Sequence, residues 1–482
     1  MSAYQTLMLE FSTNKEDIKS DLLDEVKLFF PYFEDCDFKV RHFCDENATL
    51  SGTEIKNTVC IDENSYNYAK TIEKNLSETA YKRLFKRECK LSVYRAFSSF
   101  TGVKPPWGSL TGIRPSKLVY DMLEEGLSLD ECRQQLSERF FVKNEKSALI
   151  CDIVKNQQGY YKKDDNLFNI YIHIPFCTSK CKYCSFTTET VSRASGLIPD
   201  YVKRLKEEIS DAVDTVFSYG KLCSVYVGGG TPTALSAEDL YYLLSDFPFR
   251  DVEFTVEAGR PDTITEEKLD AIKQVGASRI CVNPQTLNDK TLKEIGRSHT
   301  SEDFYLKFTL ARRYDFDVNV DLIAGLNGET IDDFKFSLDK IAELIPENVT
   351  VHTLSRKNGS ELKQEGRYFN SDIELMTEYA FDKLTDKGYI PYYLYRQKQM
   401  LGNLENVGYC LKGKQCVNNV TTMEECLSVI ACGAGSISKA VSSREKRIVR
   451  FADLRDVRLY LDRFDEKLAE KRNFFQKQFT KA

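Results

Sequence analysis

Three cysteines stand close together in the segment 171–186, YIHIPFCTSKCKYCSF. They are Cys177, Cys181 and Cys184, in CxxxCxxC spacing. Three thiolates at this spacing can ligate three irons of a [4Fe–4S] cluster and leave the fourth iron open to a chelating small molecule. Zinc is the alternative, but a structural zinc site needs four closed ligands, and His173 on the preceding strand is an awkward fourth. The spacing therefore favours an iron–sulfur cluster.

A glycine run and several polar residues follow the later predicted strands. The run VGGGTPT at 227–233 lets the backbone approach a ligand closely, although an isolated glycine run can also be a tight turn. It lacks the GK[ST] ending of a phosphate-binding loop, which disfavours a nucleoside triphosphate. Glu257 ends the third predicted strand, where a buried carboxylate needs a polar partner such as a pair of ribose hydroxyls. Three further polar residues stand near later strand ends: Gln285, Arg297 and Asp321.

The elements that must position these residues alternate between strand and helix from residue 168 onward. Such alternation predicts a parallel sheet with right-handed crossovers. A closed barrel of this kind needs eight strands, so six predict an α/β fold with an open, partial (β/α)6 barrel and active residues at the carboxyl ends of the strands. Helices are expected between them, for example at Asp200–Phe217 and Ala237–Leu244. The predicted strands are Phe168–Ile174, Ser224–Val227, Glu253–Glu257, Arg279–Val282, Val318–Ile323 and Asn348–Thr353.

The cysteine motif, with an aromatic residue before its last cysteine, resembles the signature of radical S-adenosylmethionine enzymes. The whole run at 171–186 is similar to the oxygen-independent coproporphyrinogen III dehydrogenase (oxidase) family and its haem-chaperone relatives. Four further motifs, WGSLTGIRPSK at 107–117, GNLENVGYC at 402–410, MEE at 423–425 and GAGSISK at 433–439, resemble the HemZ-type branch of that family. The resemblance covers nearly the full chain.

The resemblance implies two cofactors, a [4Fe–4S] cluster held by the three cysteines and S-adenosylmethionine. Glycines and a threonine of the glycine run would face the methionine amino group, Glu257 would bind the ribose hydroxyls, and Arg297 is suited to bidentate capture of the methionine carboxylate. Two tyrosines match aromatic positions beside the cluster and the adenine. The implied cofactor-binding residues are Tyr171, Tyr183, Gly229, Gly230, Thr231, Glu257, Gln285, Arg297 and Asp321.

The implied reaction is the oxidative decarboxylation of coproporphyrinogen III to protoporphyrinogen IX. A 5′-deoxyadenosyl radical removes hydrogen from the β-carbon of a propionate, and loss of carbon dioxide and one electron leaves a vinyl group. The resemblance also implies an electron donor of the flavodoxin or ferredoxin type. Basic residues are expected near the barrel mouth to bind the propionates, and the candidates are Arg260, Arg396, Lys398 and Lys439.

One departure from the family pattern opens an alternative. The dehydrogenases proper carry a fourth cysteine two residues after the third, and Phe186 stands there in this chain, as a non-cysteine does in the haem chaperones. The alternative is therefore a haem-binding carrier that keeps the cluster and the S-adenosylmethionine site without the dehydrogenase activity. The stretch Gly402–Tyr409 contains no histidine for a haem iron, which favours the enzyme. Radical modification of nucleic acid is a third option, disfavoured by the net charge of −6.

The chain contains fifteen cysteines, an odd number that excludes complete pairing within one chain. Most are expected to be small buried hydrophobes. A group near the C-terminus could hold an auxiliary cluster, but it contains no CxxC pair, and buried thiols are the favoured interpretation. This group is Cys410, Cys416, Cys426 and Cys432.

The rest of the 482-residue chain predicts further domains around the barrel. No apolar run is long enough to span a membrane and no export signal is visible at the start, so a cytoplasmic protein is expected. In the first region, strands are expected at Thr6–Phe11, Lys39–His42 and Thr58–Ile61 and a helix at Asp17–Phe30. The expected regions are a small α+β module at 1–90, a helical connector at 91–165, the partial barrel at 166–390 and a mostly helical, substrate-covering domain at 391–482.

Overall fold

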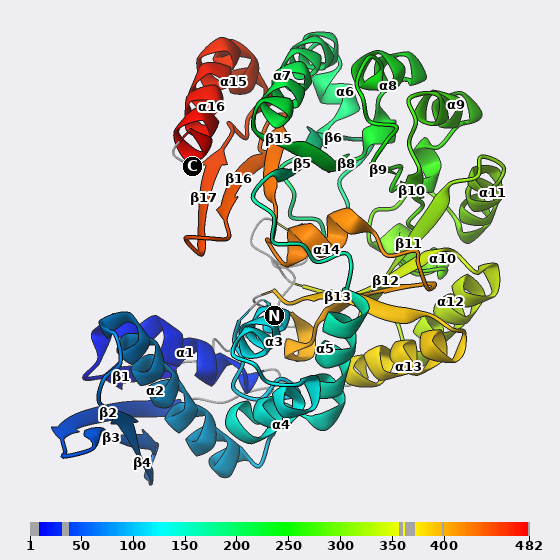
Figure 1. The fold of residues 1–482 in the computed structure, drawn as a ribbon. Helices are drawn as coiled ribbons and strands as arrows, with labels where there is room; N and C mark the ends of the chain where they lie inside the picture. Colours follow the sequence, from blue (N-terminus) through cyan, green and yellow to red (C-terminus); the bar gives the residue numbers. More distant parts are fainter. Residues whose placement is uncertain are drawn as a thin grey trace. The chain divides into compact units, whose positions relative to one another are not determined.

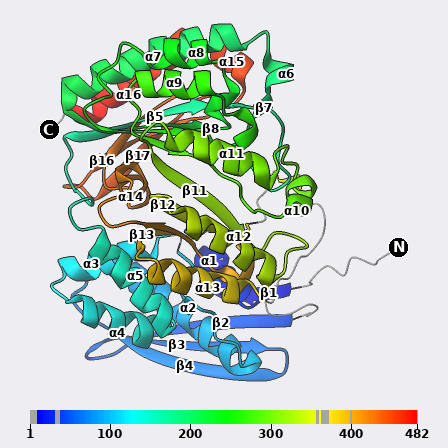
Figure 2. The ribbon, with the colours of Figure 1, turned by 90° about the vertical axis from the view of Figure 1, so that its right-hand side faces the viewer.

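The structure is a computed structural model that describes residues 9–30, 38–112, 114–355, 360–361, 372–397 and 400–480 (Figures 1 and 2). The chain divides into two compact units. The first is Met1–Cys151 together with Gly366–Ser371 and Arg396–Leu404, and the second is Asp152–Glu365, Asp372–Tyr395 and Glu405–Ala482.

The first unit combines a four-stranded sheet with helices. The sheet has the order β1-β2-β3-β4, in which β1 runs parallel to β2 and the other neighbours are antiparallel. Strands and a helix lie where the α+β module was expected, although residues 6–8 of the first expected strand lie outside the described residues. The strands are β1 (Leu9–Thr13), β2 (Phe38–Ala48), β3 (Gly52–Ile61) and β4 (Asn64–Glu73). The helices are α1 (Lys19–Lys27), α2 (Glu78–Thr101), α3 (Pro115–Glu124), α4 (Leu129–Phe140) and the start of α5 (Asn144–Asn156).

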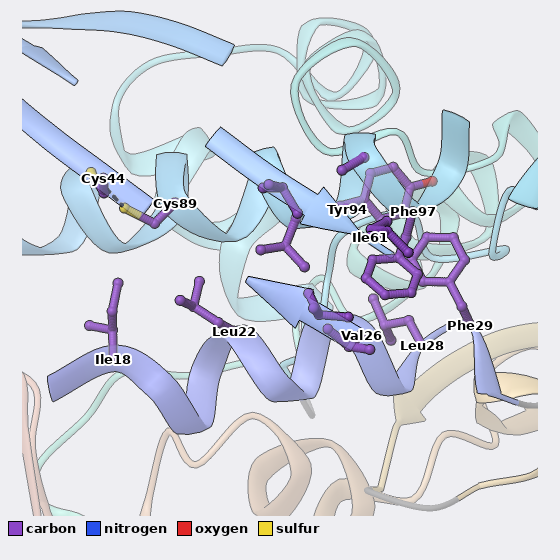
Figure 3. Close-up of a cluster of buried hydrophobic side chains, with 14 of the residues drawn as sticks. Ile18, Leu22, Val26, Leu28, Phe29, Cys44, Ile61, Cys89, Tyr94 and Phe97 are labelled. Atoms are coloured by element: carbon purple, nitrogen blue, oxygen red, sulfur yellow. Dashed lines mark hydrogen bonds between the residues drawn. The ribbon is translucent and has the colours of Figure 1, made fainter. Parts of the chain in front are cut away.

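The core of this unit lies between the sheet and helices α1 and α2. The first residues of β2 are alternately buried and exposed, so one face of the strand packs inward. Figure 3 shows Leu22 and Val26 of α1 in this core with Tyr94 and Phe97 of α2. Side chains of this size each contribute roughly 1.5–3 kcal/mol when fully buried.

The second unit is built on an eleven-stranded sheet of order β13-β14-β12-β11-β10-β9-β8-β5-β15-β16-β17. The six consecutive strands from β12 to β5 run parallel to one another, and they confirm all six predicted strands. Figure 1 shows helices along the outer side of this curved sheet. These six strands are β5 (Leu167–Ile174), β8 (Lys221–Gly229), β9 (Glu253–Glu257), β10 (Arg279–Cys281), β11 (Asp317–Ala324) and β12 (Asn348–Thr353). The helices are α7 (Ile198–Tyr219), α8 (Ala237–Leu244), α9 (Glu266–Gln274), α10 (Asp289–Glu294), α11 (Ser301–Arg312), α12 (Ile331–Leu344) and α13 (Ile373–Asp386).

Strand β5 explains how the sheet separates its core from its site. Ile170, Ile172 and Ile174 alternate along the strand and are fully buried, whereas Tyr171 and His173 point to the opposite face. The apolar face packs against α7, an amphipathic helix that buries its apolar side against the strand. The other face is left for polar and aromatic side chains.

The C-terminal region corrects the expectation of a mostly helical segment at 391–482. Five strands of this region belong to the barrel sheet. At one edge β13 (Ile390–Tyr395) pairs with β14 (Asn406–Cys410), which is antiparallel to β12. At the other edge β15 (Ser428–Cys432) is parallel to β5 and leads into β16 (Ile437–Ser442) and β17 (Arg447–Ala452). These strands are short, and β14 and β15 pair with strands that are distant in sequence, so local periodicity does not reveal how they join the sheet. The other elements are α14 (Val417–Met423), α15 (Val457–Asp462) and α16 (Phe464–Phe479).

Candidate functional site

The three cysteines lie on one loop that begins directly after β5. Phe176 and Cys177 form the short strand β6, which pairs with β7 (Glu189–Thr190) and closes the base of the loop. Within the loop, the amide of Cys184 donates a hydrogen bond to the carbonyl of Cys181 at 3.0 Å. Cys181 is buried, and Cys177 and Cys184 are half-buried. The motif is therefore at the carboxyl end of the first parallel strand, as the barrel prediction requires.

The glycine run after β8 packs against the cysteine loop. The amide of Thr231 donates to the Phe176 carbonyl at 2.8 Å, and the Thr231 hydroxyl donates to Cys177 Sγ at 3.6 Å. A Cβ on Gly230 would lie 2.5 Å from the Phe176 carbonyl oxygen and 2.9 Å from Cys177 Sγ, closer than the packing allows. Gly229 has a φ of 111°, which favours glycine. The predicted close backbone approach is present, and its immediate partner is the cysteine loop.

Arg260 anchors the middle of the cysteine loop. Its guanidinium donates to the Ser179 carbonyl at 3.1 Å and to Cys181 Sγ at 3.5 Å, and it pairs with Asp262 at 3.2 Å. The side chain is buried. This corrects the expectation that Arg260 binds a substrate propionate, because its guanidinium holds the loop instead. A buried cation beside the sulfur also offsets the charge of a thiolate there.

Arg297 connects the cysteine loop to the ends of β9 and β10. Its Nε and Nη2 donate to the Tyr183 hydroxyl at 3.2 and 2.9 Å, and its Nη1 donates to the carbonyls of Gly259 and Asn283 at 3.3 and 3.4 Å. Burial raises the pKa of Tyr183, so its hydroxyl stays neutral. The arginine fork is thus aimed at an oxygen acceptor beside the cysteines, the geometry that also binds a carboxylate in bidentate fashion.

Glu257 stands at the end of β9 as a buried carboxylate. Tyr226 on β8 donates to Glu257 Oε1 at 2.6 Å, and the Gly229 amide also donates to the carboxylate. Burial raises the pKa of Glu257 to about 7, and the hydrogen bond from Tyr226 only partly opposes that rise. The side chain can therefore change protonation state near neutral pH.

Gln285, which follows the end of β10, lies beside Asp321 in the middle of β11. The Gln285 amide donates to the Asp321 carbonyl at 3.1 Å, and Gln285 has a positive φ of 70°. Burial alone would raise the pKa of Asp321, but His352 and Asn319 favour the ionised carboxylate and lower the pKa overall. His352 Nε2 lies 3.5 Å from Asp321 Oδ2 and Asn319 Nδ2 donates to Asp321 Oδ1 at 2.8 Å.

Aromatic side chains line the same face of the sheet. Tyr171 stacks on Tyr226 with ring centroids 6.2 Å apart, and its hydroxyl lies 3.2 Å from His173 Nδ1. Burial lowers the pKa of His173 to about 4, so the ring is neutral at physiological pH. On β13, the Tyr395 hydroxyl lies 3.3 Å from His352 Nδ1.

The residues present suit a [4Fe–4S] cluster with one open iron. The loop offers three thiols, and the Gly230 contact leaves no space for a side chain against Cys177. Burial raises the pKa of the Cys177 thiol, and the Thr231 hydroxyl and Arg260 partly offset the rise. Among the described residues no three His, Cys, Asp or Glu side chains are gathered closely enough to hold a single metal ion, whereas the three thiols of a [4Fe–4S] site each bind a different iron. Phe186, at the position of the dehydrogenases' fourth cysteine, is 58% exposed.

Two of the other basic candidates have protein partners in the described structure. Arg396 belongs to the first unit, where it is buried 5.3 Å from the Trp107 ring centroid and donates to the Asn403 carbonyl at 3.0 Å. Lys439 pairs with Glu425 at 2.7 Å, beside the start of β15 and therefore at the opposite end of the sheet from the cysteine loop. The expectation for Lys439 is corrected, because this cation pairs with Glu425 at the other end of the sheet. Lys398 lies outside the described residues.

The four C-terminal cysteines are buried, and Cys410 and Cys416 share one hydrophobic cluster. Cys416 Sγ donates to Glu253 Oε1 at 3.2 Å, Cys426 Sγ to the Thr421 carbonyl and Cys432 Sγ to the Glu208 carbonyl, both at 3.8 Å. Cys410 packs in an apolar cluster with two tyrosines of β13. Each thiol therefore has a local packing or hydrogen-bonding role.

Sequence reasoning missed several residues on the inner face of the barrel. His352 could have been found from the sequence, because it stands near the end of the sixth predicted strand. It is the half-buried residue of a strand whose other residues are buried. Tyr226 is placed beside Glu257 by the β8–β9 neighbourhood, and Tyr395 beside His352 by the β13–β14–β12 pairing. The last pairing involves a strand that the sequence pattern did not predict.

Comparison with known proteins agrees with this geometry. The model of the radical SAM superfamily matches residues 171–341, which contain the cysteine loop and most of the parallel strands. The chain is 36% identical over 455 residues to the oxygen-independent coproporphyrinogen-III oxidase-like protein HemZ of Bacillus subtilis, covering 91% of this chain and 89% of that protein. It is 35% identical over 193 residues to the heme chaperone HemW of the same organism, covering 38% of this chain and 49% of HemW.

A solved structure gives the same fold. The coproporphyrinogen III oxidase HemN of Escherichia coli, a radical SAM enzyme, matches with a TM-score of 0.51 at 20% identity, over 65% of this chain and 73% of that one. The fold and the cysteine loop are those of a radical SAM protein. More narrowly, the chain belongs to the family of oxygen-independent coproporphyrinogen-III oxidase-like HemZ proteins. Radical SAM proteins use a [4Fe–4S] cluster and S-adenosylmethionine. In the part of the chain that the structure describes, no helix has the length and apolar character needed to cross a membrane.

Proposed function

We propose that the protein is a cytoplasmic enzyme that oxidatively decarboxylates propionates of coproporphyrinogen III, or of a closely related tetrapyrrole, to vinyl groups. The observation that carries the proposal is the cysteine loop at the end of β5, with Arg297, Glu257 and the glycine run around it. The relatives named as coproporphyrinogen-III oxidase and oxidase-like proteins support the choice of substrate.

The three loop cysteines are proposed to ligate the cluster, and the strand-end residues to bind S-adenosylmethionine. Arg297 is suited to take the methionine carboxylate in place of the Tyr183 hydroxyl, since its fork already faces an oxygen acceptor. Glu257, held by Tyr226, is suited to accept hydrogen bonds from the ribose. The remaining proposed contacts are Tyr171, Tyr183, Gly229, Gly230, Thr231, Gln285 and Asp321.

The bound cofactors supply one-electron cleavage of the sulfonium and a carbon radical that removes a hydrogen atom from the substrate. The reaction balances at the propionate. Removal of one hydrogen atom from the β-carbon leaves a substrate radical, whose carboxylate departs as carbon dioxide with one electron as the vinyl double bond forms. We propose a flavodoxin- or ferredoxin-type protein as the donor that reduces the cluster, and an electron carrier of the same type as the acceptor of the electron that the substrate releases, so that one electron enters and one leaves per propionate. The residues of the chain orient the reactants and exclude water.

A haem carrier is the second candidate. Two observations favour it: the similarity to heme chaperones, and Phe186 where the dehydrogenases proper carry a fourth cysteine. The enzyme is preferred because Gly402–Tyr409 contains no histidine that could bind a haem iron.

Anaerobic reconstitution distinguishes the two candidates. The purified chain is loaded with iron and sulfide and incubated with S-adenosylmethionine, a reductant and coproporphyrinogen III. We expect protoporphyrinogen IX to form with the wild type and not with Cys181→Ala. Thr178→Ala is the matched control on the same loop, since within the described part of the chain its exposed hydroxyl hydrogen-bonds to Asp262 alone. Stoichiometric haem retention without turnover would favour the carrier, and uptake of far fewer than about four irons per chain would contradict both candidates.

A further inference from the structure

The core of the first unit holds two cysteines from different elements with their sulfur atoms facing each other (Figure 3). Cys44 lies on β2 and Cys89 on α2, 45 residues apart in the chain. Their exposed fractions are 1% and 0%. The Cys89 thiol donates a hydrogen bond to Cys44 Sγ at 3.7 Å. The two thiols are therefore direct neighbours inside a packed core.

The backbone on both sides of this contact is held in place. The Asn14 side chain makes two hydrogen bonds to Cys44, donating to its carbonyl at 3.0 Å and accepting from its amide at 2.8 Å. The Cys89 carbonyl accepts a hydrogen bond from the Ser92 hydroxyl at 2.7 Å. Because both cysteines are fixed in this way, the meeting of their sulfurs is set by the fold of the unit and is not a chance contact of mobile side chains.

The surroundings give the two sulfurs different chemistry. Lys15, which is paired with Glu46 at 2.9 Å, contributes a nearby positive charge. The hydrogen bond from Cys89 and the Lys15 cation lower the pKa of Cys44, against the opposing effects of burial, Glu46 and Asp45. The same hydrogen bond, together with burial, raises the pKa of Cys89. Cys44 is thus the better nucleophile, and Cys89 is the thiol positioned to react second.

We propose that Cys44 and Cys89 are a redox-active dithiol that a hydroperoxide converts into a disulfide between β2 and α2. The Cys44 sulfur attacks a peroxide oxygen, the O–O bond breaks, and a sulfenic acid and one molecule of water or alcohol result. The Cys89 sulfur then attacks the sulfenic sulfur, so that the S–S bond forms, the S–O bond breaks and water leaves. Two electrons pass from the sulfurs to the peroxide, and the two thiol protons end in the released water or alcohol.

The disulfide is compatible with the present arrangement of the chain. An S–S bond requires the two sulfurs to approach by roughly a further 1.6 Å, a distance that rotation of the two side chains and a small shift of α2 can supply. It would join the sheet to α2 covalently across the core. Since it closes a long loop of the chain, it should raise the melting temperature of the first unit. This site is independent of the cluster and of the proposed function.

The test is peptide mapping of the reduced full-length chain after brief exposure to hydrogen peroxide. Remaining thiols are blocked with N-ethylmaleimide, and the digest is examined by mass spectrometry without reduction. We expect a Cys44–Cys89 linked peptide from the wild type and none from Cys44→Ser or Cys89→Ser. Cys132→Ser, which removes another buried cysteine of the same unit, should leave the linked peptide unchanged. In a second experiment with dimedone, Cys89→Ser should trap a sulfenic acid on Cys44, while Cys44→Ser should trap none on Cys89.

Measurements on the wild type alone test the proposal if a variant fails to fold. Absence of the linked peptide from wild type that shows a cooperative melting transition would overturn the proposal. So would equal linkage in the folded chain and in the urea-unfolded chain, because the folded contact would then have no effect. Dimedone labelling of Cys89 as strong as that of Cys44 would overturn the assignment of Cys44 as the nucleophile.

Discussion

Replacement of Glu257 by glutamine should remove a pH dependence from the binding of S-adenosylmethionine. Burial raises the pKa of Glu257 to about 7, and the carboxylate form is the better acceptor for ribose hydroxyls. With a pKa near 7, roughly nine tenths of this carboxyl is ionised at pH 8 and about one tenth at pH 6. The wild type should therefore lose about tenfold in affinity between pH 8 and pH 6, or about 1.4 kcal/mol. Glu257→Gln should lack this loss.

The assay is equilibrium dialysis of labelled S-adenosylmethionine against the anaerobically reconstituted protein at several pH values. The ligand's own amino group also titrates, but it does so equally with both proteins, so the ratio of their dissociation constants isolates Glu257. Tyr226→Phe should shift the wild-type profile to higher pH, because the hydrogen bond from Tyr226 favours the ionised carboxylate. A variant-to-wild-type ratio that stays constant from pH 6 to pH 8 would refute the reasoning.

The same carboxyl should affect the stability of the protein without ligand. Its folded pKa is raised above the ordinary value of 4.5, so between pH 4.5 and about 7 the folded chain keeps a proton that the unfolded chain has released. Stability relative to Glu257→Gln should therefore fall as the pH rises through this window, by up to about 3 kcal/mol, and then level off. Urea unfolding of both proteins at pH 5 and pH 8 measures the difference, and a relative stability that rises with pH would contradict the assigned direction.

Two further substitutions test the supports of the site. Lys471 is buried between Glu208 and Asp453. Lys471→Met should leave these two buried carboxylates without their cation and lower the free energy of unfolding in urea by about 3–5 kcal/mol. A loss below 1 kcal/mol would show that the ion pairs of Lys471 are not the main support of α16. Gly230→Ala should push the glycine run away from the Phe176 carbonyl. The iron retained after reconstitution, measured by colorimetric assay, should then fall to less than half of the wild-type content. Full retention of iron would contradict the close approach at Gly230.

The parallel strands and the strand-end residues could be predicted because both leave local signals. The apolar alternation of Ile170, Ile172 and Ile174 marks β5 as a strand with one buried face. Polar residues such as Glu257 stand out because they end apolar runs. Parallel neighbours align their carboxyl ends at one edge, so residues far apart in sequence arrive at the same place.

The remaining features depend on contacts that no local pattern encodes. Strand β15 is short and fully buried, and it is defined by pairing with β5 across more than 250 residues. Arg260 and Lys439 are ordinary basic residues in the sequence, and only the fold reveals that Arg260 holds the cysteine loop and Lys439 pairs with Glu425. The contact between Cys44 and Cys89 likewise joins a strand and a helix that local periodicity treats separately.

The central proposal, hydrogen removal from a tetrapyrrole propionate, is tested most directly by isotope transfer. Coproporphyrinogen III deuterated at the propionate β-carbons is incubated with the reconstituted protein, S-adenosylmethionine and a reductant under anaerobic conditions. Mass spectrometry then measures deuterium in the 5′-deoxyadenosine that is released. The proposed function predicts one deuterium in each 5′-deoxyadenosine formed during turnover. Release of 5′-deoxyadenosine without deuterium, with the tetrapyrrole unchanged, would contradict it.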